Sequence, residues 1–183
     1  MHPFDHPVLW QGHSTMIDEC LAQGVTPASV LLSVGGGGLL CGVAQGLQQN
    51  ALPLVPILAT ETEGAASMHA ALRAGQPVAL EMVQTCASSL GARQVCPQVL
   101  TVSNQQTLVP VLAQDDQTLA ACRWLLDTHQ LLVEPACGAA LAPLVCPTPE
   151  QAKHVDALPH GPVVVIICGG VGLDAQTLLK IDA

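Results

Sequence analysis

Aromatic and basic residues are scarce in this sequence. Its 183 residues include one phenylalanine, two tryptophans and no tyrosine, and only five lysines and arginines stand against fourteen acidic residues, for a formal net charge of −9. Proteins that bind nucleic acid or anionic lipid use clusters of lysine and arginine to neutralise phosphate groups, so we expect neither partner. The shortage of aromatic residues leaves leucine, valine and alanine to build most of the core.

Long apolar runs are absent as well. No stretch reaches the roughly 18 to 20 apolar residues that a membrane-spanning helix needs. The first residues, Met1 to Asp5, contain neither the basic segment nor the apolar segment of a secretory signal peptide. We therefore expect a cytoplasmic protein whose length fits one domain with room for a core.

The eight cysteines form no C-x-x-C pair, and most of them lie in apolar surroundings. The histidines near the start of the chain also lack the spacing of metal ligands. These patterns favour buried free thiols in a reducing compartment over a disulfide framework or a metal site. The cysteines are Cys20, Cys41, Cys86, Cys96, Cys122, Cys137, Cys146 and Cys168.

Four consecutive glycines, Gly35 to Gly38, are the most informative stretch of the chain. The apolar residues 30–32 before them predict a buried strand, and residues 39–47 after them predict a helix. A glycine backbone can approach a ligand closely, and the free N–H groups in the first turn of a helix favour an anion. The stretch therefore predicts a phosphate-binding loop, and the alternative is a flexible turn without a ligand.

The spacing around the glycines separates the possible phosphate ligands. The dinucleotide fingerprint G-x-G-x-x-G would require a glycine where Cys41 stands, although Glu61 lies near the expected position of its acidic residue. No Lys-Ser or Lys-Thr follows the glycines, which excludes a P-loop. A nucleotide-binding α/β domain stays open as an alternative at this point.

Strands and helices are expected to alternate along the chain. We predict strands over residues 30–32, 55–59, 99–102, 108–111 and 163–167, helices over 8–22, 39–47, 65–74 and 115–129, and a loose surface segment framed by prolines over 147–162. This order predicts a three-layer α/β fold with a parallel sheet and right-handed crossovers. Ligands of such folds bind at the carboxyl ends of the strands. We therefore predict that the glycine loop and Cys168 face one crevice.

Four motifs, taken in order, resemble one family. They are HPFD at residues 2–5, SVGGGGLL at 33–40, VEPACGAALA at 133–142, and a terminal apolar strand that ends in CGG at 168–170. The set is similar to the serine/threonine dehydratases, and most of all to those that act on serine. These enzymes depend on pyridoxal phosphate (PLP) and have the tryptophan-synthase-β-like fold, or fold type II. The resemblance covers essentially the whole chain and implies a lyase of amino-acid catabolism, a homodimer that converts serine to pyruvate and ammonia.

The resemblance also implies how the cofactor is bound. Gly35, Gly36, Gly37, Gly38 and Leu39 match the loop that holds the PLP phosphate. Cys168 matches the residue beside the pyridine nitrogen, where a neutral thiol would leave that nitrogen unprotonated. The alternative is that Cys168 is only a buried thiol at a strand end, but its motif favours the role beside the cofactor.

A second group of residues matches positions near the cofactor. Glu61, Ala65 and Leu90 match the ligands of a monovalent cation such as K⁺, for which a carboxylate and backbone carbonyls supply oxygen atoms. Ser89 matches a position beside the substrate, and Glu134 begins a segment that the family buries. From the residues alone, Glu61 could be a solvated acid in a loop.

Two departures from the family pattern affect the expected function. Val171-Gly172 stands where the family has an amide residue, and the S-F-K-x-R-G motif that carries the Schiff-base lysine is missing. The two lysines of the chain, Lys153 and Lys180, lie in unrelated contexts. We therefore expect residues 1–183 to be the C-terminal, phosphate-binding part of a dehydratase large domain, without the lysine segment and the small domain, and inactive alone. A non-catalytic paralogue that binds PLP or a partner is the alternative.

Overall fold

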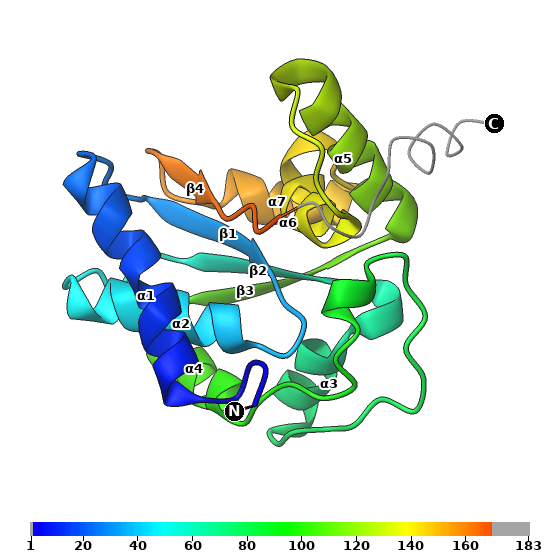
Figure 1. The fold of residues 1–183 in the computed structure, drawn as a ribbon, viewed down its shortest axis with the longest axis horizontal. Coiled ribbons are helices and arrows are strands. Elements are labelled where there is room, and N and C mark those ends of the chain that lie inside the picture. Colours follow the sequence, from blue (N-terminus) through cyan, green and yellow to red (C-terminus); the bar gives the residue numbers. More distant parts are fainter. Residues whose placement is uncertain (1, 170–183) are drawn as a thin grey trace.

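A computed structural model describes residues 2–169, which form a parallel four-stranded sheet in the order β3-β2-β1-β4 (Figure 1). Every pair of neighbouring strands is parallel, and β1 lies between β2 and β4. The strands are β1 (Ser29–Ser33), β2 (Ile57–Thr62), β3 (Leu108–Ala113) and β4 (Val163–Val165). The expected parallel sheet is thus confirmed.

Helices cover both faces of the sheet and complete the three layers (Figure 1). One layer contains α1 (Pro7–Ala22), α2 (Gly38–Gln49) and α4 (Gln98–Gln105), and the other contains α5 (Asp115–His129), α6 (Pro135–Val145) and α7 (Pro149–Asp156). The short helix α3 (Ser67–Ala74) and the turns η1 (Glu63–Ala65) and η2 (Ser88–Leu90) connect β2 to α4. Within residues 2–169, no helix combines the length and the apolar character required to cross a membrane.

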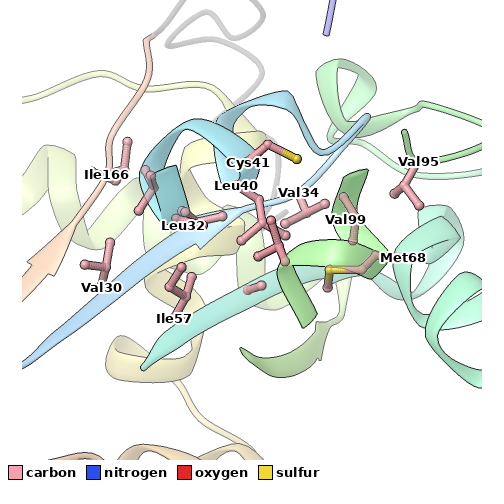
Figure 2. Close-up of a cluster of buried hydrophobic side chains, with 14 of the residues drawn as sticks. Val30, Leu32, Val34, Leu40, Cys41, Ile57, Met68, Val95, Val99 and Ile166 are labelled. Atoms are coloured by element: carbon pink, nitrogen blue, oxygen red, sulfur yellow. The ribbon is translucent and has the colours of Figure 1, made fainter. Parts of the chain in front are cut away.

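The two faces of β1 are buried in different clusters. Val30 and Leu32 belong to one buried cluster with residues of α2 and α4, in which Figure 2 shows Leu32 near Leu40, whereas Leu31 packs with Leu58 and Val111 on the opposite face. All five residues of β1 are buried. A central parallel strand with helices on both faces needs apolar residues in succession, which explains the uninterrupted run in the sequence.

Residues 99–102 are helical, so the predicted strand there is wrong. They lie in α4, which starts directly after Pro97 and whose residues Val99 and Val102 are both buried. Because residues three apart share a helix face, the two β-branched side chains can enter the same core cluster from a helix. Tertiary packing has overridden the strand preference of valine here.

The segment 147–162 is also more ordered than its prolines suggested, because it contains α7. Pro149 occupies the first turn, where a missing N–H is harmless, and Thr148 accepts a hydrogen bond from the Gln151 N–H at 3.2 Å. The Gln151 side chain bonds back to the Thr148 N–H, which completes a capping box. The predicted loose segment is therefore wrong over Pro149–Asp156.

Candidate functional site

The backbone of the glycine loop presents a row of free N–H groups. Gly37 has a φ of 90° and immediately precedes α2. The Gly36 carbonyl accepts a hydrogen bond from the Cys96 N–H at 2.9 Å, and the Gly37 carbonyl accepts one from the Cys41 N–H at 3.0 Å. Within the described residues, no backbone N–H from Gly35 to Leu40 donates a hydrogen bond. Such N–H groups at the start of a helix form an anion-binding site.

Close neighbours leave little or no room for a side chain at any of the four glycines. A Cβ on Gly36 would overlap the Phe4 ring, and a Cβ on Gly38 would lie 2.6 Å from the Phe4 carbonyl oxygen. On the other side of the loop, a Cβ on Gly37 would overlap the Val99 side chain, and one on Gly35 would lie 3.1 Å from backbone atoms of η2. The loop is therefore packed between the N-terminal segment and the chain around η2 and α4, which excludes a merely flexible turn.

Phe4 is fixed above the loop by its neighbours in sequence. The Trp10 Nε1–H donates to the Phe4 carbonyl at 2.8 Å, and the His2 ring meets the Phe4 ring edge-on with centroids 4.5 Å apart. The His2 Nδ1 accepts from the Asp5 N–H at 2.9 Å, and the His6 Nδ1 caps α1 by accepting from the Val8 N–H. The sequence analysis took HPFD only as part of the family pattern and did not predict that Phe4 packs on the glycine loop. The signal for this packing is a phenylalanine that stands shortly before a helix with a histidine at its start.

One cleft of about 320 Å³ joins the glycine loop to the end of β4. Five segments far apart in the sequence contribute to its walls. The lining residues are Pro3 and Phe4, Ser33, Gly35 to Leu40, Ser89 and Leu90, Glu134 and Ala136, and Cys168. The prediction that the loop and Cys168 face one crevice is confirmed.

Cys168 lines the cleft and carries a thiol that resists ionisation. The residue is exposed by its accessible surface, but the protein groups packed around the thiol partly exclude water and raise its pKa, and the nearby Cys137 and Glu134 raise the pKa further because they disfavour a second negative charge beside them. The thiol is therefore neutral at neutral pH and can donate its S–H. All eight cysteines are free: Cys41, Cys96, Cys122 and Cys137 are buried as expected, whereas Cys86 and Cys168 are exposed.

Glu61 is fully buried inside β2, so the solvated loop acid considered from the sequence is wrong. Its Oε1 accepts from the Met68 N–H at 2.6 Å, and its Oε2 accepts from the His69 N–H at 2.9 Å. The His69 Nδ1 lies 2.8 Å from the same Oε2. The carboxylate thus caps the first turn of α3, where free N–H groups stabilise a negative charge.

The other residues singled out from the sequence fall at separate places. Ala65 is buried in η1, while Leu90 in η2 and the adjacent Ser89 both line the cleft. Glu134 lines the cleft as the residue that precedes α6. Lys153 lies on α7, and no lysine of residues 2–169 lines the cleft. Lys180 and Val171-Gly172 lie outside the described residues.

A larger cavity of about 570 Å³ lies beside β3, lined by His69, Gln117, Gln151 and His154 among others. We place the candidate site in the smaller cleft because only that cleft contains the free N–H groups of the glycine loop. Across residues 2–169, no three His, Cys, Asp or Glu side chains gather in a way that could hold a metal ion.

The cleft fits a small ligand that combines a phosphate with a polar ring atom. Its volume lies at the lower end of the roughly 300–1,000 Å³ that ligand pockets occupy. The free N–H groups of the loop suit a phosphate, and the neutral Cys168 thiol, which lines the same cleft, suits a nitrogen with a lone pair. These two features together match the two polar ends of PLP.

Comparison with known proteins agrees with this fit. Residues 1–169 match the family described as pyridoxal-phosphate dependent enzyme. The chain is 40% identical to the serine dehydratase-like protein of Mus musculus, over 98% of this chain and 55% of that protein. It is 38% identical to the L-serine dehydratase/L-threonine deaminase of Bos taurus, over 98% of this chain and 56% of that protein. The chain spans about half the length of these curated relatives.

A solved structure shows the same arrangement of elements. The crystal structure of a fungal L-serine ammonia-lyase from Rhizomucor miehei superposes with a TM-score of 0.90 and 34% sequence identity. The superposition covers 100% of this chain and 58% of that chain. The fold is therefore that of the fold-type II PLP enzymes, as the resemblance implied.

Proposed function

The chain belongs to the pyridoxal-phosphate dependent enzymes, and from this premise we propose that it is the phosphate-binding part of a serine/threonine dehydratase large domain. The proposed reaction is the β-elimination of serine or threonine to a 2-oxo acid and ammonia. The identity of 38–40% to serine dehydratases supports this reaction class. The chain accounts for about half of such a protein, so its activity requires residues beyond those in the cleft.

In this proposal the described residues bind and orient the cofactor. The N–H groups from Gly35 to Leu39 hold the phosphate, and the glycine-lined wall leaves no side chain in the way. The Cys168 thiol stays protonated beside the ring nitrogen, because burial disfavours its thiolate. When bound, PLP supplies the electron sink for removal of the α-proton and loss of the β-hydroxyl. No lysine of residues 2–169 lines the cleft, so the base for the α-proton comes from another segment.

The observation that carries the proposal is the shared cleft. Free N–H groups and a neutral thiol, from segments about 130 residues apart in the chain, face the same space of about 320 Å³. A dinucleotide would use the loop but gives no reason for a thiol at the opposite end. The Cys168 position therefore favours PLP over the nucleotide alternative.

Binding is tested by titrating the chain with PLP and following its absorbance and the quenching of tryptophan fluorescence. We expect weak, reversible binding that inorganic phosphate competes away. Ser89 is exposed and lines the cleft, whereas its neighbour Ser88 is exposed and does not. Ser89 lies next to Gly35 of the loop, so Ser89→Asp should weaken binding by adding a negative charge to the cleft near the phosphate site, and Ser88→Asp should leave binding unchanged. Equal effects of the two substitutions, or no binding by the wild type, would contradict the proposed site.

Turnover is tested by supplying the missing base. The chain is joined, or mixed as a second polypeptide, with the lysine-bearing remainder of the fungal L-serine ammonia-lyase, and pyruvate or 2-oxobutyrate is measured in a coupled assay. We expect no turnover by the chain alone and 2-oxo acid production by the combined protein. Turnover by the chain alone would contradict the division of roles proposed here. A folded combination that binds PLP but stays silent would favour a non-catalytic paralogue.

The cation site expected at Glu61, Ala65 and Leu90 belongs to the proposal as well. Glu61 supplies a buried carboxylate, and the hydroxyl of Ser67, the first residue of α3, is fully buried and has no hydrogen-bond partner within residues 2–169. A buried oxygen without a partner is a place where an ion can bind. We expect KCl to raise the thermal midpoint more than LiCl does at equal ionic strength. Equal midpoints in the two salts would count against the site.

The remaining parts of the proposal concern the setting of the complete enzyme. A cytoplasmic location is supported by the eight free cysteines, which suit a reducing compartment. A role in amino-acid catabolism follows from the proposed reaction, which breaks down serine or threonine. A homodimer is supported by the resemblance to the serine/threonine dehydratases. Size-exclusion chromatography of the combined protein tests this assembly, and a monomer at micromolar concentration would contradict it.

A further inference from the structure

Cys168 lies beyond the residues of β4 that pair with β1 in the sheet. The ladder between β1 and β4 covers Val163–Val165, and the last sheet hydrogen bond runs from the Ile166 N–H to the Leu31 carbonyl at 2.9 Å. Only Ile167 separates this last sheet residue from Cys168, and within residues 2–169 no sheet hydrogen bond is made by either of the two. Pairing within the sheet therefore does not fix the position of this thiol in the cleft.

The next residue, Gly169, is fixed by the start of α6 instead. Its carbonyl accepts from the Glu134 N–H at 3.0 Å and from the Cys137 thiol at 3.2 Å. Its own N–H donates to the Cys137 sulfur at 3.3 Å. Both polar groups of the Gly169 backbone thus bond to one side chain, which is 2% exposed.

A thiol can make both bonds at once because its S–H donates while its sulfur accepts. Cys137 is the third residue of α6, and its neighbour Ala136 lines the cleft. The same helix end thus forms a wall of the cleft and binds the chain that carries Cys168. An alanine at position 137 would leave the Gly169 N–H without its partner.

We propose that Cys137 is a positioning residue that fixes Cys168 at the ring-nitrogen end of the cleft by clamping the Gly169 backbone. This inference rests on the proposed function only for the role of Cys168; the clamp itself is a property of the chain without cofactor. Cys137 does not line the cleft, so it acts through Gly169 and Cys168. Cys137 also lies close enough to raise the pKa of the Cys168 thiol, and only the exclusion of water from that thiol raises the pKa more.

The reactivity of Cys168 in the chain without PLP reports on the clamp. Native protein is alkylated with iodoacetamide at pH 8 for increasing times, quenched, unfolded and digested with trypsin. Cleavage at Lys153 and Lys180 gives a peptide of residues 154–180 in which Cys168 is the only cysteine. Cleavage at Arg73 and Arg93 gives a peptide of residues 74–93 in which Cys86 is the only cysteine. Cys86 is exposed and serves as an internal reference.

Two substitutions separate positioning from general stability. Cys137→Ala removes both bonds to Gly169 and also one of the groups that raise the pKa of the Cys168 thiol, so we expect Cys168 to be alkylated severalfold faster. Cys137→Ser keeps a donor and an acceptor at the same place, so alkylation of Cys168 should stay near the wild-type rate. Cys86 should react at the same rate in all three proteins.

Two results would overturn the proposal. An unchanged Cys168 rate in Cys137→Ala would show that the clamp does not position this residue. A parallel rise at Cys86 and Cys168, or equal rates in Cys137→Ser and Cys137→Ala, would show that position 137 acts only on overall stability or volume.

A second readout links the clamp to the cofactor. If the wild type binds PLP, Cys137→Ala should bind it more weakly and Cys137→Ser should bind it about as well as the wild type. The variant with the faster alkylation of Cys168 should thus have the lower affinity for PLP. If the wild type does not bind PLP, the proposed function fails while the alkylation result still decides the clamp. If PLP binds equally well to all three proteins although alkylation differs, the clamp exists but Cys168 is not the residue that recognises the ring.

Discussion

The ring of Phe4 occupies the space in front of Gly36 that a side chain would otherwise fill. The glycine loop is therefore glycine-rich for two reasons that the sequence does not distinguish. One is the access of a ligand to its N–H groups, and the other is the close approach of the N-terminal segment. Both reasons act at the same cleft, because Phe4 and Gly36 line it together.

Gly36→Ala should lower the free energy of unfolding by about 1–3 kcal/mol, as overpacking of a filled site does. The added methyl group would displace Phe4 and with it the segment that Trp10 and His2 fix. Urea denaturation followed by circular dichroism measures the change. Gly12→Ala in α1 is the matched control, since a Cβ there meets nothing within 4 Å, and it should stabilise the helix by about 0.5–1 kcal/mol. Equal effects at the two positions would contradict the packing argument.

Trp10→Phe should destabilise the protein by about 1 kcal/mol, because the hydrogen bond from the indole N–H to the Phe4 carbonyl is lost. The same substitution at Trp124 in α5, a side chain that is 39% exposed, is the control and should change stability less. Thermal unfolding of both variants checks the difference. A larger loss at Trp124 would show that the bond to Phe4 matters little.

Glu61→Gln should destabilise the protein by at least about 2 kcal/mol, since the new amide group points a donor at N–H groups that the carboxylate now accepts. Glu63 lies two residues further along the chain and is exposed, so Glu63→Gln removes the same charge but should leave stability nearly unchanged. Urea unfolding of both variants at one ionic strength provides the comparison. If Glu61→Gln is as stable as the wild type, the carboxylate does not cap α3.

The free energy of unfolding should fall as pH rises above 9, and Cys122 should account for part of the fall. Burial raises the pKa of the Cys122 thiol from its ordinary value of 9.0 to about 12. Above pH 9 the unfolded chain loses this proton while the folded chain keeps it, so stability present below pH 9 is lost between pH 9 and 12. The slope approaches about 1.4 kcal/mol per pH unit for one thiol. Urea unfolding under reducing conditions should show a flatter dependence for Cys122→Ala, and identical slopes would disprove the assignment.

Much of the candidate site could be predicted from the sequence because it rests on local patterns. An apolar strand, four glycines and a helix predict the loop at Gly35 to Gly38, and a second apolar strand places Cys168 at a carboxyl end. Parallel order then brings the two together. The environment of Glu61 could not be predicted in this way, because its partners lie in a helix that starts six residues later and is defined only by folding.

The errors in secondary structure have one physical cause. In α4 the valines favour a strand locally, and in α7 the prolines suggest a loop, but contacts with distant residues decide both segments. Val99 packs against the glycine loop, and the Gln151 amide donates to the Leu112 carbonyl at 2.6 Å. Neither contact is visible from a window of neighbouring residues.

The position of β4 beside β1 has a consequence for how the chain folds during synthesis. Ser29 at the start of β1 pairs with Val163, one of the last residues that the structure describes. The central strand therefore keeps one unpaired edge until nearly all of the described chain has left the ribosome. Contacts between residues so far apart in sequence slow folding. Until β4 pairs with it, the apolar strand β1 has an unpaired edge that can associate with other chains. We expect ribosome-bound chains that end before residue 163 to be sensitive to proteases and to recruit chaperones, and longer chains to become resistant as β4 joins the sheet.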